Sequence, residues 1–169
     1  MINRLSMMTF QLDECLSAKK LISACHAQGQ VTVRAMPRRM KGSADPQILD
    51  TVMAGSNPLL TVDAAIAEDH VAHIPDFHPG IVMVVNAPSV PQTMTVSIAR
   101  RILAAFKQSF SDWHMISLRN SVVQVSQEGV EVSQVIGGAL QRSAYLPFSA
   151  SDWKSQLQAL LGANAGRPS

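Results

Sequence analysis

Thr9-Phe10-Gln11-Leu12-Asp13-Glu14-Cys15-Leu16-Ser17 joins an apolar segment to a pair of carboxylates. The apolar part ends at Leu12, and apolar residues at helical spacing follow from Leu16 onward. This order predicts a buried strand that carries Asp13 and Glu14 to its carboxyl end and leads into a helix. Ligands of open α/β sheets bind at the carboxyl ends of the strands, so this end of the predicted strand is a candidate site.

The same layout recurs twice further along the chain. Asp45-Pro46 opens a second helical pattern, because Asp favours the cap position and Pro is tolerated at the first helical position. A short apolar strand, residues 59–62, ends at Asp63. Parallel strands bring their carboxyl ends to one edge of the sheet, so we expect Asp13, Asp45 and Asp63 to converge in one acidic pocket. Taken singly, Asp45 could instead be a helix cap, and the other two could be polar strand ends.

Strands alternate with helices over most of the chain, and the pattern then changes to strands alone. In chain order we expect strand 7–12, helix 17–28, strand 30–35, a helix opened by Asp45 and ended by residues 55–58, strand 59–62, a helical turn or two over 64–69, strand 81–85 and helix 94–110. Three strand-like segments, 115–118, 121–126 and 130–136, follow. Such an order predicts an α/β fold with a mainly parallel central sheet and a C-terminal antiparallel hairpin. One domain is expected over residues 1–136, and residues 137–169 are expected to add an extension with one helix, 152–161, and a frayed tail.

Composition gives weaker indications about partners. The 169 residues are 47% apolar and 15% charged, with a formal net charge of +2. So few charges predict that a partner covers part of the surface, and a homodimer is one such arrangement. The net charge alone is too small to indicate nucleic-acid binding. Basic residues nevertheless gather at Arg34, Arg38, Arg39 and Lys41. The last three, just before Asp45, are candidates for holding an RNA backbone, with a solvated loop as the alternative.

Neither the cysteines nor the histidines match a strong template for a zinc site. Cys15 and Cys25 bracket the first predicted helix, which would separate them by about 15 Å, whereas a disulfide needs Cα atoms within about 7 Å. Reduced thiols, the lack of a secretory signal and the lack of an apolar run of roughly 18 residues predict a cytoplasmic protein without a membrane span. His70, His73 and His78 are expected to be loop histidines bonded to solvent or backbone.

Carboxylates gathered at one edge of a sheet repel each other unless a cation neutralises them. Mg²⁺ and Mn²⁺ prefer oxygen ligands, and such an ion can activate water and stabilise charge on a phosphodiester. The predicted chemistry is therefore metal-assisted hydrolysis. Asp13, Asp45 and Asp63 would be its catalytic metal ligands, and the basic loop would hold phosphates.

Four segments in this order are similar to the short PIN-like proteins. They are Leu12-Asp13-Glu14-Cys15-Leu16-Ser17, Gly42-Ser43-Ala44-Asp45-Pro46-Gln47-Ile48-Leu49, Leu60-Thr61-Val62-Asp63 and His78-Pro79-Gly80-Ile81-Val82. The resemblance covers roughly residues 5–135. It implies a three-layer α/β/α domain and a ribonuclease that uses Mg²⁺ or Mn²⁺, often the toxin of a toxin–antitoxin pair with an antitoxin protein as its partner.

Two positions depart from that family pattern. Cys15 stands where the family commonly has Asn, and Ala65 stands where it has the second acid of an Asp-x-Asp pair. Glu14, Glu68 and Asp69 are additional candidate ligands, because the last two lie one helical turn beyond the gap. The missing acid leaves a second interpretation open, a non-catalytic PIN-like domain that binds RNA or a protein partner.

Overall fold

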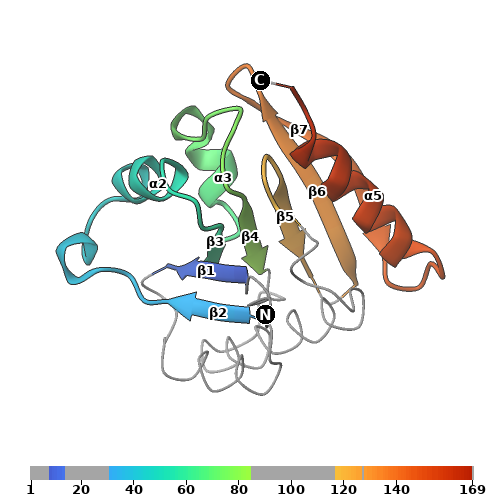
Figure 1. The fold of residues 1–169 in the computed structure, drawn as a ribbon, viewed down its shortest axis with the longest axis horizontal. Coiled ribbons are helices and arrows are strands. Elements are labelled where there is room, and N and C mark those ends of the chain that lie inside the picture. Colours follow the sequence, from blue (N-terminus) through green and yellow to red (C-terminus); the bar gives the residue numbers. More distant parts are fainter. Residues whose placement is uncertain (1–7, 14–30, 85–116, 127, 169) are drawn as a thin grey trace, which may run out of the picture.

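The computed structural model describes residues 8–13, 31–84, 117–126 and 128–168, which form a seven-stranded mixed sheet with helices packed on it (Figure 1). The strand order is β2-β1-β3-β4-β5-β6-β7. The strands are β1 (Met8–Leu12), β2 (Val31–Arg34), β3 (Leu59–Thr61), β4 (Ile81–Val84), β5 (Val122–Val125), β6 (Gly129–Ile136) and β7 (Ala139–Pro147). Strands β1 to β5 pair in parallel, whereas β6 and β7 pair antiparallel. The predicted α/β fold with a mainly parallel sheet and an antiparallel C-terminal hairpin is confirmed.

The described helices are α2 (Asp45–Met53), α3 (Ile66–Asp69), α5 (Trp153–Ala165) and the short 3-10 turns η1 (Arg38–Met40) and η2 (Val71–His73). Helix α2 begins at Asp45, one residue earlier than a cap at Asp45 would give. Helix α5 begins after Asp152 and continues to Ala165, beyond its predicted end at Leu161. The helices predicted at 17–28 and 94–110 lie outside the described residues. Of the strand predicted at 115–118 the structure describes Ser117 and Leu118, and neither lies in a strand.

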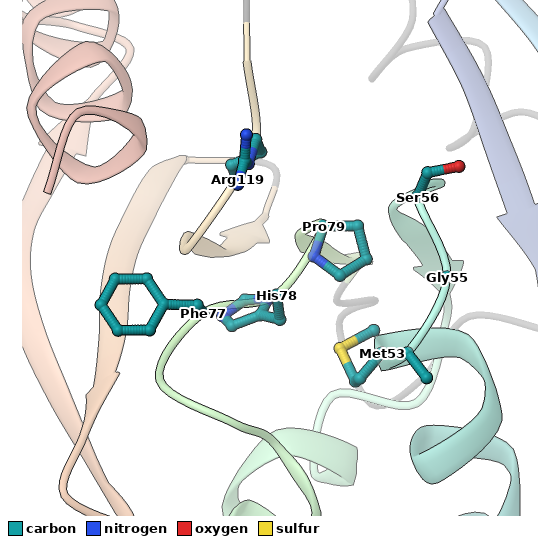
Figure 2. A pocket seen from close by; sticks show the side chains of 8 residues that line it. Met53, Gly55, Ser56, Phe77, His78, Pro79 and Arg119 are labelled. Atoms are coloured by element: carbon teal, nitrogen blue, oxygen red, sulfur yellow. The ribbon is translucent and has the colours of Figure 1, made fainter. Parts of the chain in front are cut away.

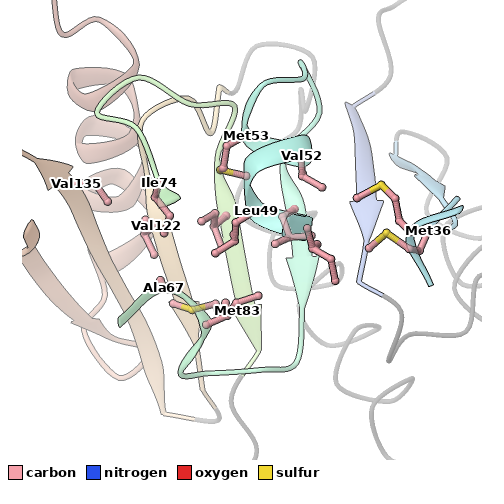
Figure 3. Packing of buried hydrophobic residues seen from close by; sticks show 14 residues of the cluster. Met36, Leu49, Val52, Met53, Ala67, Ile74, Met83, Val122 and Val135 are labelled. Carbon is pink, nitrogen blue, oxygen red and sulfur yellow. The ribbon is translucent and has the colours of Figure 1, made fainter. Parts of the chain in front are cut away.

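Two clusters of buried apolar side chains cover opposite faces of the sheet. Side chains alternate along a strand, so Ile81 and Met83 of β4 join the cluster that contains residues of α2 and α3, and Val82 and Val84 join the cluster that contains residues of α5. Figure 3 shows the α2 side, with Leu49 of α2 packed toward the strands. All four residues of β4 are buried, which explains the unbroken apolar run in its sequence.

The chain reverses its direction across the sheet between β1 and β3. Strand β2 follows β1 in the chain and lies outside it, whereas β3 lies on the other side of β1 and leads on to β4 and β5. The strand that follows β1 in the chain therefore lies toward one lateral edge of the sheet, and the strand that follows β3 lies toward the other. In open parallel sheets such a point leaves a crevice at the carboxyl ends of the two strands, and ligands bind there.

Residues beyond 136 continue the same sheet. Strand β7 pairs with β6 along its length, and Figure 1 shows α5 beside these two strands. Leu157 and Leu161 of α5 are 1% exposed and lie in the same cluster as Phe10 and Leu12 of β1. The predicted boundary at Ile136 falls at the turn of the β6–β7 hairpin.

Candidate functional site at the carboxyl ends of β1 and β3

One threonine hydroxyl links two of the predicted acidic residues. Thr61, the last residue of β3, is fully buried and donates a hydrogen bond from Oγ1 to Oδ2 of Asp13 at 2.6 Å. The same Oγ1 accepts a hydrogen bond from the backbone N–H of Asp63 at 3.1 Å. Asp13 follows β1 directly and is only 6% exposed, and its own N–H donates to the Leu60 carbonyl at 3.0 Å. Asp13 and Asp63 are thus positioned around the paired ends of β1 and β3.

The chain turns sharply after β3 and thereby fixes the side chain of Asp63. Its Oδ1 accepts the N–H of Ala65 at 3.0 Å, which is the bonding pattern of an Asx turn leading into α3. The other carboxylate oxygen makes no hydrogen bond to a described residue, and Asp63 is half-buried. Ala65, where the resemblance expects a second acid, is exposed at the N-cap of α3.

Asp45 has a different partner. The N-cap of α2 is Ala44, and no side chain caps the helix, so the interpretation of Asp45 as a helix cap is wrong. Its carboxylate lies in the first turn, where negative charge is favourable near the helix N-terminus. Oδ2 of Asp45 lies 3.6 Å from Nε2 of His70, just after α3.

The remaining candidate ligands are spread over the surface or undescribed. Glu68 and Asp69 are exposed in α3, and Glu14 lies outside the described residues. Within the part of the chain that the structure describes, no group of three or more His, Cys, Asp or Glu side chains is placed to hold a metal ion. Asp13 and Asp63 are therefore the two predicted ligands that shared contacts bring to the same strand ends.

The donors at these two strand ends fit a hard cation. Mg²⁺ is usually bound by one or two protein carboxylates and keeps several of its waters. Asp13 offers a buried carboxylate held in place by Thr61, and Asp63 offers a carboxylate oxygen that the Asx turn leaves unused. Oxygen ligands of this kind suit Mg²⁺ or Mn²⁺ better than a softer metal.

The predicted RNA-binding residues lie on and after η1. Arg38, Arg39 and Lys41 are exposed, while the buried side chain of Met40 anchors the turn in the core. Only Arg39 of these three cations lines a cavity of about 310 Å³ beside α2, and Arg34 at the end of β2 lines it too. Arg34 belongs to the basic cluster that the sequence shows, but its place in the cavity depends on how η1 and α2 pack.

His78 lies just before β4, at the amino end of that strand, and is buried. Its Nδ1 accepts the N–H of Gly80 at 3.1 Å, so the ring proton belongs on Nε2. Burial lowers the pKa of His78 from 6.5 to about 4, with the nearby Arg167 acting in the same direction and Asp76 opposing it. The side chain borders a second cavity of about 390 Å³, together with Phe77, Met53 and Arg119 (Figure 2).

The other two described histidines are paired with carboxylates, so the expectation that they bond to solvent or backbone is wrong: His70 pairs with Asp45, and His73 with Asp50 through Nδ1 and Oδ1 at 2.9 Å. Both cysteines lie outside the described residues. Among the described helices, none combines the length and the apolar character that crossing a membrane requires.

Comparison of the chain with models of protein families, with curated proteins and with solved structures found no match.

Proposed function

We propose that the chain is a metal-dependent endoribonuclease with a three-layer, PIN-like α/β/α architecture. The observation that supports it is the position of Asp13 and Asp63 at the carboxyl ends of β1 and β3, where the chain reverses direction across the sheet. Ligand sites of open α/β sheets occur at this point. A buried carboxylate such as Asp13 is costly unless it is hydrogen-bonded or binds a cation, and Thr61 supplies a hydrogen bond.

Asp13 and Asp63 would hold Mg²⁺ or Mn²⁺, and Asp45 would complete the triad once its carboxylate left His70. When bound, such an ion activates water and stabilises the charge that develops on a phosphodiester. Thr61 acts as a positioning residue, because its hydroxyl fixes Oδ2 of Asp13 and receives the N–H of Asp63. Groups that orient ligands in this way usually change metal affinity or activity by about 10–100-fold when removed.

The test is cleavage of single-stranded RNA by the purified protein with Mn²⁺. Asp13→Asn keeps the shape of the side chain and an oxygen that can accept from Thr61, yet removes the charge. We expect its activity to fall by at least about 100-fold, since losing a ligand should cost no less than losing an orienting partner. Asp152→Asn is the matched control, because Asp152 is exposed at the start of α5. Equal activity of Asp13→Asn and the wild type would exclude this site.

The role of Thr61 can be tested separately. Thr61→Val removes the hydroxyl at nearly constant volume and is expected to lower Mn²⁺-dependent activity by about 10–100-fold. Thr61→Ser keeps the hydroxyl and should retain most of the activity. The apparent Mn²⁺ affinity, read from activity against metal concentration, should weaken in Thr61→Val alone. Equal metal affinity in both variants would mean that Thr61 only stabilises the fold.

A second candidate is a PIN-like domain that binds RNA or a protein partner without cleaving RNA. The exposed Ala65 at the start of α3 favours it, because an acid is expected there. This alternative predicts no cleavage and no stabilisation by metal. A ligand that binds only the folded state raises the melting temperature, so a rise with millimolar Mn²⁺ in the wild type but not in Asp13→Asn would count against it.

If the ribonuclease is a toxin, the chain would also slow the growth of a cell that lacks the matching antitoxin.

A further inference from the structure

A cavity of about 310 Å³ lies between α2 and η1, next to the paired strands β1 and β2. Its polar lining consists of Gln11, Arg34, Arg39, Thr51, Ser56 and Asn57. None of its described lining residues carries a carboxylate, so nothing in the lining opposes the two guanidinium charges. The cavity is therefore electropositive.

The two arginines are available for a ligand. Both are exposed, and neither makes an ion pair with a described residue. Other polar groups in the lining are already engaged: the Thr51 hydroxyl donates to the Gln47 carbonyl at 3.0 Å, and Nε2 of Gln11 donates to the backbone carbonyls of its neighbours. The donors left over are those of Arg34, Arg39, Ser56 and Asn57. Guanidinium groups with hydroxyl and amide donors form a site that recognises phosphate.

The position of this cavity relates it to the acidic residues. Gln11 lines the cavity and lies two residues before Asp13, so the two side chains point to the same face of β1. Two residues of a strand span about 7 Å. Arg34 is the register partner of Gln11 on β2, the outer strand, and lines the same cavity. An anion near Gln11 would therefore lie about two residues along β1 from Asp13, whereas Ser56 and Asn57 line the part of the cavity that precedes β3.

We propose that this cavity binds a backbone phosphate of single-stranded RNA through Arg34 and Arg39. That phosphate neighbours the phosphodiester at Asp13 and Asp63, so the inference rests on the proposed function and extends it to how the strand is held. The proposal gives the three cations of the basic loop different roles. Arg39 contacts the RNA strand inside the cavity, whereas Arg38 and Lys41 contribute only through their general charge. It also adds Arg34, which lies outside that loop.

Binding can be measured without cleavage by fluorescence anisotropy of a labelled 12-nucleotide RNA in EDTA. Arg34→Gln and Arg39→Gln are each expected to weaken binding roughly tenfold, as for the loss of a charge-assisted hydrogen-bonded contact. Loss of one phosphate contact should also reduce the slope of log K against log salt by about 0.7. Both residues are exposed, so the variants should melt like the wild type.

Arg142→Gln is the charge-matched control, because Arg142 is exposed on β7 at the far end of the sheet from β2. Its affinity should stay near that of the wild type. Arg38→Gln should cost clearly less than Arg39→Gln. The inference is overturned if the wild type fails to bind RNA in EDTA, or if Arg34→Gln and Arg39→Gln lose no more affinity than these two comparison variants.

Competition identifies the source of the phosphate. Unlabelled RNA should displace the probe at far lower concentration than inorganic phosphate or adenosine monophosphate; displacement at equal concentrations would assign the cavity to a free phosphate ligand and overturn the strand assignment. Failure of this inference differs from failure of the proposed function. Arginine-dependent binding without Asp13-dependent cleavage retains the cavity and rejects the nuclease. Cleavage that depends on Asp13 but not on Arg34 or Arg39 would retain the nuclease and reject phosphate binding in the cavity.

Discussion

Among the described glycines, Gly80 combines a close approach of the neighbouring backbone with a positive φ. Its φ is +123°, and a Cβ added there would lie 2.5 Å from the Leu118 carbonyl oxygen and 2.8 Å from the Leu118 Cβ. Gly80→Ala combines this clash with backbone strain, so we expect the free energy of unfolding to fall by about 3 kcal/mol or more in urea titrations. Gly162→Ala is the control: its Cβ meets nothing within 4 Å inside α5, and it should raise stability by about 0.5–1 kcal/mol. Equal stability of both variants would contradict the geometry at the start of β4.

His78 should make the stability depend on pH. Its pKa is lowered from 6.5 to about 4 by burial, so between these values the unfolded chain binds a proton that the folded chain excludes. The free energy of unfolding therefore falls as pH drops from 6.5 to 4, by about 3 kcal/mol in total. His78→Asn keeps an acceptor for the Gly80 N–H and should remove this contribution. Urea unfolding at pH 7, 5.5 and 4.5 checks it, with His73→Asn as the control. Identical pH dependence in the wild type and His78→Asn would refute the assignment.

The buried strands were predictable from the sequence, whereas the exposed strand β7 was not. Strands β3 and β4 are covered on both faces, and β1 buries Phe10 and Leu12 on one face, so their apolar residues mark these strands plainly in the sequence. Strand β7 (Ala139–Pro147) lies at the edge of the sheet, and only Leu146 in it is buried. Hairpin pairing with β6 forms this strand in spite of its weak pattern. Apolar periodicity detects burial, and β7 has little of it.

The acidic site was predictable in part for the same reason. Asp13 and Asp63 each follow a buried strand, and parallel pairing of β1 with β3 brings these ends together. The pairing of Asp45 with His70 depends on how α2 packs beside the segment after α3, and no periodicity encodes that. The cavity with Arg34 likewise depends on the packing of η1 against α2.

Hydrogen bonds join the C-terminal segment to the residues just before β5. The side chain of Asn120 donates to the Asn164 carbonyl, and the side chain of Asn164 donates to Oγ of Ser121, both at 3.0 Å. All three residues are at most 5% exposed. Buried polar groups that lose their partners cost about 1–3 kcal/mol each, so α5 and the β5 entrance are expected to stabilise each other.

Residues 1–136 should therefore fail to fold alone. Leaving out 137–169 removes Leu146, Leu157 and Leu161 from the cluster that covers one face of the sheet. Each buried leucine is worth about 2–5 kcal/mol, and three of them reach the 5–15 kcal/mol that is typical of a whole domain. We expect no cooperative thermal transition by circular dichroism for this fragment.

A point substitution separates this claim from the side effects of truncation. Leu157→Asp places a charge at a 1% exposed position of α5, whereas Gln158→Asp places the same charge next to it on the exposed face. The first should lose cooperative unfolding and the second should melt near the wild type, because a buried unpaired carboxylate is strongly unfavourable and an exposed one is solvated. If the 1–136 fragment melts cooperatively and Leu157→Asp is tolerated, the predicted domain boundary at 136 is right and the C-terminal segment is an independent addition. If both lose the transition, β7 and α5 are parts of one folding unit that also supports the ends of β1 and β3.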